Sequence, residues 1–69
     1  MTQNERILKY LDDYGSITPA EAMVDLGVYR LAARIKELKK RGYKFDTVLV
    51  PYWNRYGEKG RYAMYKRAV

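Results

Sequence analysis

The stretch LGVYRLAARIKELKKRGYKF, residues 26–45, combines an apolar side with a strong positive charge. Seven of its residues are lysine or arginine, and Glu37 is its one acid. At about 100° per residue, four of its apolar side chains fall within an arc of about 80°: Val28, Leu31, Ile35 and Leu38. These features predict a helix that ends at Gly42, packs one side on the rest of the chain and presents cations on the other.

Two further helices are predicted upstream, and each begins with a capping box. Thr2 is followed three residues later by Glu5, and Thr18 is followed in the same way by Glu21. Pro19 stands at the first helical position of the second helix, where proline is favoured. We expect these two helices to form the surface on which the apolar side of the third helix packs.

The first helix should end at Gly15 and the second at Leu26, before Gly27. The side chains expected on their inner faces follow at helical spacing: Ile7, Leu8, Leu11 and Tyr14 in the first helix, and Ala22, Met23 and Leu26 in the second. The intervening SIT, residues 16–18, is long enough only for a brief extended piece.

From Tyr43 onward the pattern is typical of strands. The run YKFDTVLV is rich in β-branched and aromatic residues, and Pro51 is expected to end it. NRYGEKG, residues 54–60, has the composition of a loop, and RYAMYKRAV, residues 61–69, is a second extended run. Together they predict an antiparallel hairpin, with Trp53 and Tyr56 covering the open end of the core.

The first of these strands carries apolar side chains on both faces. Phe45 and Leu49 alternate onto one face, and Val48 and Val50 onto the other. One small helical layer cannot cover both faces, so the strands are expected to offer a surface for a homodimer or a protein partner.

The order of helix, short extended piece, helix, helix and hairpin predicts an α+β fold, the winged helix-turn-helix. It has three helices and a C-terminal β-hairpin wing, and we expect residues 1–69 to form a single domain of this kind. In such a fold the second helix of the helix-turn-helix enters the major groove of DNA.

The chain also resembles a family of small winged helix-turn-helix proteins encoded by bacteriophages and prophages. The most specific matches are four short motifs: ITPAEA, LGVYRLAARIKEL, RGY and NRYGEKGRYA. The chain is more distantly similar to the DNA-binding domain of the biotin repressor, but its Gly27 to Gly42 interval is shorter, so that domain's contacts are not transferred. The resemblance implies a DNA-binding fold and a bacterial or phage origin.

The positive charge is unevenly distributed along the chain. The net charge of +6 is made of −3 over residues 1–27, +6 over residues 28–44 and +3 over residues 45–69. Such segregation favours a surface that faces a polyanion over charge that merely keeps the protein in solution.

The N-terminal half of the basic helix supplies the candidate base contacts. Tyr29 and Arg30 are expected in its first turn, and Arg30 suits the O6 and N7 atoms of a guanine. Ala33 lets the backbone approach the groove and suits a thymine methyl group. Tyr29 is either such a contact or a half-buried ring beside Val28.

Further along the helix, Lys36 and Lys40 are expected to meet phosphates and to set the register. Arg34 suits a base contact and a salt bridge to Glu37 about equally well. The hairpin loop is expected to hold four more DNA-binding candidates: Asn54, Arg55, Lys59 and Arg61. They favour a wing that reaches the phosphate backbone or the minor groove, over the alternative of a polar turn that only protects the hairpin from aggregation.

Histidine and cysteine are absent, and with them the commonest catalytic and metal-binding groups. We therefore expect no enzyme activity, no metal and no cofactor. No apolar run approaches the roughly 18 residues of a membrane span, and the N-terminus lacks the pattern of a signal peptide. These features predict a cytoplasmic protein with no membrane partner.

The leading hypothesis is a double-stranded-DNA-binding protein that regulates transcription, excision or replication in a phage or prophage. A protein-binding module, acting as an inhibitor or recruiter of a host nucleoprotein complex, is an alternative because winged helices also serve as docking domains. RNA binding, which would use the same charge, is a third.

Overall fold

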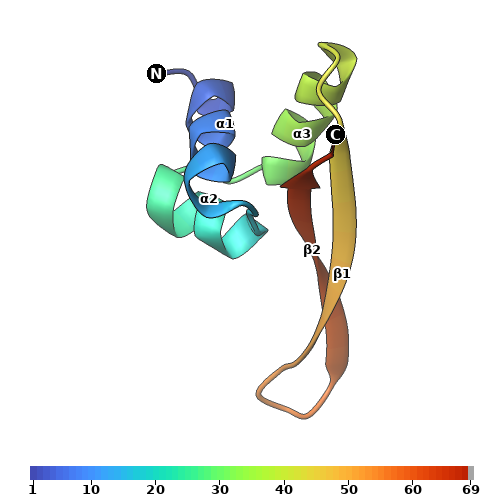
Figure 1. Cartoon of the computed structure of the whole chain (residues 1–69). Helices are drawn as coiled ribbons and strands as arrows, with labels where there is room; N and C mark the ends of the chain where they lie inside the picture. Colours follow the sequence, from blue (N-terminus) through green and yellow to red (C-terminus); the bar gives the residue numbers. More distant parts are fainter. Residues whose placement is uncertain (69) are drawn as a thin grey trace.

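The computed structural model describes residues 1–68, which form three helices and one two-stranded antiparallel sheet (Figure 1). In chain order the elements are α1 (Gln3–Tyr14), α2 (Pro19–Leu26), α3 (Leu31–Lys40), β1 (Phe45–Trp53) and β2 (Lys59–Arg67). The predicted α+β winged helix-turn-helix fold is confirmed. The helices cluster at one end, and the hairpin of β1 and β2 extends well past α2 (Figure 1).

Both predicted capping boxes are present. The Thr2 hydroxyl accepts the Glu5 N–H at 3.1 Å, and the Glu5 carboxylate accepts the Thr2 N–H at 2.7 Å. This backbone hydrogen bond lowers the pKa of Glu5 below its usual value. Thr18 and Glu21 make the same reciprocal pair at the start of α2, at 3.2 and 3.0 Å. Local sequence therefore determines where α1 and α2 begin.

The three helices enclose a small core, into which the predicted stripe of α3 packs. Its buried apolar residues come from all three helices and their connections: Ile7, Tyr10, Leu11, Ile17, Ala22, Val28, Leu31, Ile35 and Leu38. Phe45 and Tyr65 at the base of the hairpin pack against this core from one side.

Two predicted core positions are wrong. Tyr14 is 71% exposed, and Met23 on α2 also points outward. Tyr10, one turn before Tyr14, is buried instead, and its hydroxyl donates to the Asp25 carboxylate at 2.8 Å. The Tyr14 ring lies outside the Tyr10 ring, with 4.6 Å between their centroids. The phenol occupies this place because α2 offers it an acceptor.

The turn between α2 and α3 places the start of α3 later than predicted. Gly27 has a left-handed φ of 69°, and the Val28 N–H donates to the Ala22 carbonyl at 2.9 Å. Val28 is fully buried, and the chain passes through a bend at Tyr29 before the helix begins. The prediction that Tyr29 and Arg30 lie in the first helical turn is therefore wrong, because both precede Leu31 and Arg30 is the N-cap.

Gly42 closes α3 with a Schellman motif. Its φ is 100°, its N–H donates to the Lys39 carbonyl at 3.1 Å, and the Tyr43 N–H donates to the Leu38 carbonyl at 3.1 Å. The chain then turns directly into β1, which brings the hairpin back beside α3 (Figure 1).

The predicted extended piece at Ile17 adds a short third edge to the sheet. Ile17 and Tyr65 exchange both backbone hydrogen bonds, at 3.0 and 2.9 Å. The backbone polar groups of Tyr65 therefore point away from β1, and those of its partner Thr47 also point outward. This outward orientation repeats at every second residue of β1, at Thr47, Leu49 and Pro51. Pro51 therefore lacks an N–H at a position where none is needed to bond with β2. The prediction that Pro51 ends the strand is wrong, since β1 continues to Trp53.

The hairpin loop is shorter than predicted. Strand pairing runs to Trp53 and Lys59, so Lys59 and Arg61 lie in β2 rather than in the loop. Trp53 is 64% exposed and Tyr56 is 83% exposed, beyond the reach of the core. The prediction that they cover its open end is wrong, because the paired strands carry them away from the helices (Figure 1).

Gly60 and Tyr52 face each other across the hairpin, where a Cβ atom on residue 60 would lie 2.5 Å from the Tyr52 ring. We expect Gly60→Ala to destabilise the protein by about 1–3 kcal/mol, because the ring must move. In a Tyr52→Ala background the same change should cost about 0.5 kcal/mol or less. Urea unfolding of the four proteins measures this coupling, and additive costs would show that the ring does not confine residue 60.

Candidate nucleic-acid interface

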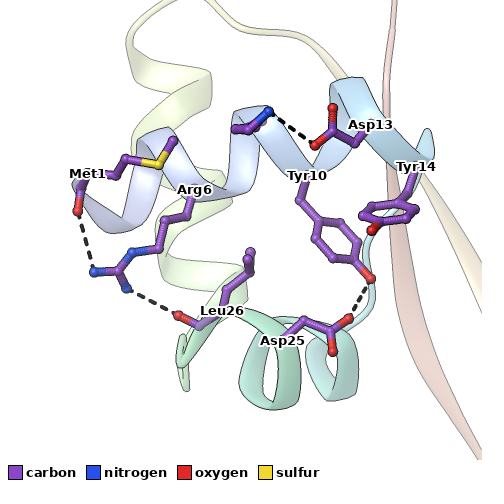
Figure 2. Close-up of a pocket in the computed structure, with 8 residues that line it drawn as sticks. Met1, Arg6, Tyr10, Asp13, Tyr14, Asp25 and Leu26 are labelled. Carbon is purple, nitrogen blue, oxygen red and sulfur yellow. Dashed lines mark hydrogen bonds and ion pairs between the residues drawn. The ribbon is translucent and has the colours of Figure 1, made fainter.

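A hydrogen bond from Arg6 joins α1 to the end of α2, directly before the turn that leads into α3 (Figure 2). Arg6 donates through Nη1 to the Leu26 carbonyl at 3.1 Å and through Nη2 to the Met1 carbonyl at 3.4 Å. A guanidinium at the carboxyl end of α2 satisfies a free carbonyl and complements the helix dipole. This contact holds the end of α2 directly before the turn that leads into α3.

The same region contains an open pocket of about 350 Å³ (Figure 2). Its polar side chains already have partners, because Lys9 pairs with Asp13 at 3.3 Å and Tyr10 donates to Asp25. The hydrogen bond to Asp25 raises the pKa of the Tyr10 phenol above its usual value. The Tyr10–Asp25 hydrogen bond joins α1 to α2, whereas the Lys9–Asp13 pair lies within α1. Because these polar groups are already engaged, we place the candidate site elsewhere, on α3 and the hairpin.

The turn before α3 presents two candidate side chains to solvent. Tyr29 is 79% exposed, which excludes the alternative of a half-buried ring beside Val28. Arg30 is exposed as well, and its side chain makes no capping hydrogen bond. Behind them Ala32 is exposed and Ala33 is half-buried. Two alanines at the start of the helix leave room for the close approach of another molecule.

Arg34 is held in a contact between α3 and α1. Its Nε lies 3.1 Å from Glu37 Oε1, and its Nη1 donates to the Gln3 side chain at 3.4 Å. The buried Asn4 donates to Glu37 at 3.4 Å from the same helix, α1. Of the two roles expected for Arg34, the salt bridge to Glu37 is the one that the structure contains.

The outer side of α3 is a row of exposed lysines: Lys36, Lys39 and Lys40. Within residues 1–68 the ion pairs involve Lys9, Arg34 and Arg67, and none involves these lysines. Lys39, which the sequence analysis did not select, is as accessible as its neighbours. Its position next to Lys40 on the predicted helix is the sequence signal that could have identified it. The row is therefore a cationic strip with no acidic side-chain partner among the described residues.

The loop at the end of the hairpin is tightly ordered by Asn54. The Asn54 Oδ1 accepts the N–H groups of Tyr56 and Glu58 at 2.9 and 3.0 Å, and its Nδ2 donates to the Glu58 carboxylate at 3.0 Å. The Gly57 N–H donates to the Asn54 carbonyl at 3.0 Å, and Gly57 has a φ of 79°. This is a type I turn followed by a left-handed glycine. It leaves Arg55 and Tyr56 projecting at the tip.

Lys59 and Arg61 lie side by side on β2 rather than at the tip. They are opposite Trp53 and Pro51 in the strand register, so all four side chains belong to one face of the hairpin. The Lys59 Nζ lies 5.5 Å from the centre of the Trp53 ring. These two cations and Arg55 form the basic end of the wing, which we define as residues 45–67.

The predicted site residues thus form two groups. Tyr29, Arg30, Ala33, Lys36 and Lys40 lie on α3 or at its start, and Arg55, Lys59 and Arg61 lie at the far end of the wing. The wing extends along the 39 Å long axis of the molecule, away from the end of α3 (Figure 1). The two remaining candidates, Arg34 and Asn54, are engaged in internal contacts.

A basic helix-turn-helix with a β-hairpin wing defines a class of small DNA-binding domain. Residues 2–67 match the model of the winged helix-turn-helix domain family, and the chain belongs to this family. Winged helix-turn-helix domains are generally DNA-binding modules without catalytic activity. No curated protein and no solved structure gives a significant match.

Residues 1–68 contain no cluster of three or more histidine, cysteine, aspartate or glutamate side chains arranged to bind a metal. No helix in the same part of the chain combines the length and the apolar character needed to cross a membrane.

We expect Asn54→Ala to loosen the tip of the wing, because the backbone N–H groups of Tyr56 and Glu58 lose their acceptor. Their amide protons should exchange with solvent about fivefold faster, as the loss of one ordinary hydrogen bond implies. Hydrogen exchange followed by NMR measures this, with Arg55→Ala as the control that keeps the acceptor. Unchanged exchange in the Asn54 variant would mean that the side chain does not hold the loop.

Proposed function

We propose that this protein is a double-stranded-DNA-binding regulator of phage or prophage origin that acts in the cytoplasm of a bacterial host. Residues 1–69 act as one domain, with α3 in the major groove and the wing on the neighbouring backbone. The observation that carries the proposal is the row of exposed lysines on the outer side of α3, which pair with no acidic side chain within residues 1–68, in a chain of the winged helix-turn-helix family.

In this arrangement the beginning of α3 reads bases. Arg30 and Tyr29 project from the turn before the helix, and Arg30 donates to the O6 and N7 atoms of a guanine. Ala33 lies in the first turn of the helix and contacts a thymine methyl group. Lys36 and Lys40 follow on the outer side and bind phosphates, which sets the register without reading sequence.

The wing contributes backbone contacts from Arg55, Lys59 and Arg61. The turn built by Asn54 orders the tip before DNA arrives, so little conformational entropy is lost on binding. Arg34 keeps α3 aligned with α1 through its salt bridge to Glu37, and in this role it supports the site without touching DNA.

The distribution of acids supports this orientation. Asp12, Asp13, Glu21 and Asp25 lie on α1 and α2, whereas the exposed lysine row lies on α3. A polyanion approaching the molecule is repelled from the acidic helices and attracted to the lysines. The charge pattern therefore orients DNA toward the α3 face and increases the association rate.

We expect binding to duplex DNA to weaken steeply with salt, because each phosphate contact displaces a condensed cation. About five contacts correspond to a slope of about −4 to −5 in a plot of log affinity against log salt concentration. Fluorescence anisotropy of a labelled duplex at several salt concentrations measures the slope. A flat response would contradict the proposal.

Two substitutions separate base reading from phosphate binding. Arg30→Ala should lower the preference for the best site over a scrambled one by about 1–3 kcal/mol, because the guanine contact is lost. Lys40→Ala should weaken binding to both duplexes alike and make the salt slope less negative by about one. Competition titrations measure both effects. Lys9→Ala on the acidic helix α1 is the matched control and should change neither.

A second candidate function is that of a protein-binding module, an inhibitor or recruiter of a host nucleoprotein complex, or a homodimer joined through the strands. The observation that favours it is the apolar face of the hairpin opposite Trp53, where Val48, Tyr52 and Tyr62 are exposed. Tight capture of a host protein, together with no binding to duplex DNA in the titration, would support this function over the first.

A further inference from the structure

The far end of the wing carries a tryptophan that phosphate binding does not explain. Trp53 is the single tryptophan of the chain, and it stands on the last paired residue of β1 with 64% of its surface exposed. A small domain gains much from burying an indole ring, and this ring is held away from the core by the length of the hairpin. Trp53 shares its face of the hairpin with Leu49, which is also exposed, and contiguous apolar surface of this kind marks interaction sites.

The strand register sorts the surrounding side chains into two columns. Side chains of directly opposed residues lie on the same face, and so do residues two apart along one strand. On the Trp53 face, β1 contributes an apolar column and β2 a basic one: Leu49, Pro51 and Trp53 in the first, and Lys59 and Arg61 in the second. At the far end of the hairpin this face is therefore apolar along β1 and cationic along β2, up to Ala63, which lies opposite Leu49.

The tryptophan ring is already in contact with one cation. The Lys59 Nζ lies 5.5 Å from the ring centre, in the position of a cation–π contact. The ammonium group meets one side of the ring, and the exposed remainder is free to meet a flat partner. A nucleobase is such a partner, because it stacks on tryptophan whatever its sequence identity.

The two columns also match the layout of one nucleotide strand. Lys59 and Arg61 are two residues apart on a strand, a separation of about 6.8 Å, which is similar to that of successive phosphates. The apolar column beside them faces the side on which the sugars and bases of that strand would lie. In an intact duplex both faces of a base are covered by its neighbours, so stacking on Trp53 needs an unpaired base.

We propose that Trp53, Lys59 and Arg61 form a binding site for an unpaired nucleotide of a DNA strand, distinct from the duplex-binding surface of α3. The cations bind the phosphates on either side of the nucleotide, and the indole stacks on its base. The proposed function already gives Lys59 and Arg61 contacts to duplex backbone. This site goes beyond that binding, because it adds Trp53 and a stacking contact that requires an open base pair. It would let the wing recognise a bulge, a flipped base or a single-stranded segment.

The single tryptophan allows a direct test with the full chain. Its fluorescence is followed during titration with three ligands of matched sequence: a fully paired duplex, the same duplex with one unpaired thymidine, and one strand alone. Stacking on Trp53 should quench the emission with the bulged duplex and the single strand, and leave it nearly unchanged with the paired duplex. Equal quenching by all three, or quenching by none, would overturn the proposal.

Affinities of variants provide a second readout that does not depend on the fluorophore. Trp53→Ala should weaken binding to the bulged duplex and the single strand by about 5- to 150-fold, as the loss of one stacked base implies, and binding to the paired duplex by less than about twofold. Trp53→Phe should retain most of the affinity. Tyr14→Ala, which removes an exposed ring from α1, is the matched control and should have no effect.

The remaining outcomes are also decisive. Circular dichroism and urea unfolding of Trp53→Ala show whether its loss of affinity reflects unfolding or the missing indole. Tryptophan quenching by anionic phosphatidylserine vesicles, without quenching by any oligonucleotide, would assign the surface to membranes and overturn the proposal. If the unmodified protein bound the bulged duplex but not the paired duplex, the function proposed for α3 would be refuted and the site at Trp53 would be supported.

Discussion

The burial of Val28 in the turn between α2 and α3 is the contact on which the rest of the structure depends. The side chain is fully enclosed, and its N–H is bonded to the carbonyl of Ala22. Since Val28 faces the core, the next two residues must face solvent before the helix begins. The exposure of Tyr29 and Arg30 is therefore a consequence of core packing. Arg6 strengthens the same turn by holding the Leu26 carbonyl.

The acidic and basic side chains differ in their contacts as well as in their positions. Most of the acids have internal partners: Glu5 and Glu21 complete capping boxes, Asp25 accepts the Tyr10 hydroxyl and Glu37 holds Arg34. The lysines on the outer side of α3 have no such role within residues 1–68. The acids stabilise the fold, whereas the lysines remain available to an external polyanion.

The wing obtains its rigidity from contacts that a two-stranded hairpin rarely has. Ile17 supplies a short third edge at its base, the Tyr52 ring lies against Gly60 near its far end, and Asn54 orders its tip. The alternation of side chains then gives the wing two chemically different faces. The face that anchors the wing to the core through Phe45 and Tyr65 becomes basic and aromatic beyond the helices. The opposite face stays apolar, which offers a second surface for a protein partner.

The sequence by itself determined the elements, because the signals that define them are local. The capping residues Thr2 and Thr18, the left-handed glycine Gly42 and the spacing of the α3 stripe act within one or two turns of chain. The lysines of α3 were placed correctly on its outer side for the same reason, since helical periodicity alone separates them from the buried stripe.

Only the tertiary structure decided which side chains near the element ends are buried and where the hairpin stops. Tyr10 is buried instead of Tyr14 because α2 presents Asp25 to its hydroxyl. The strand continues through Pro51 because Ile17, far away in sequence, sets which backbone groups point outward. Trp53 is left in solvent because the pairing that follows carries it past the helices. Each outcome depends on the juxtaposition of distant segments, which local sequence patterns do not encode.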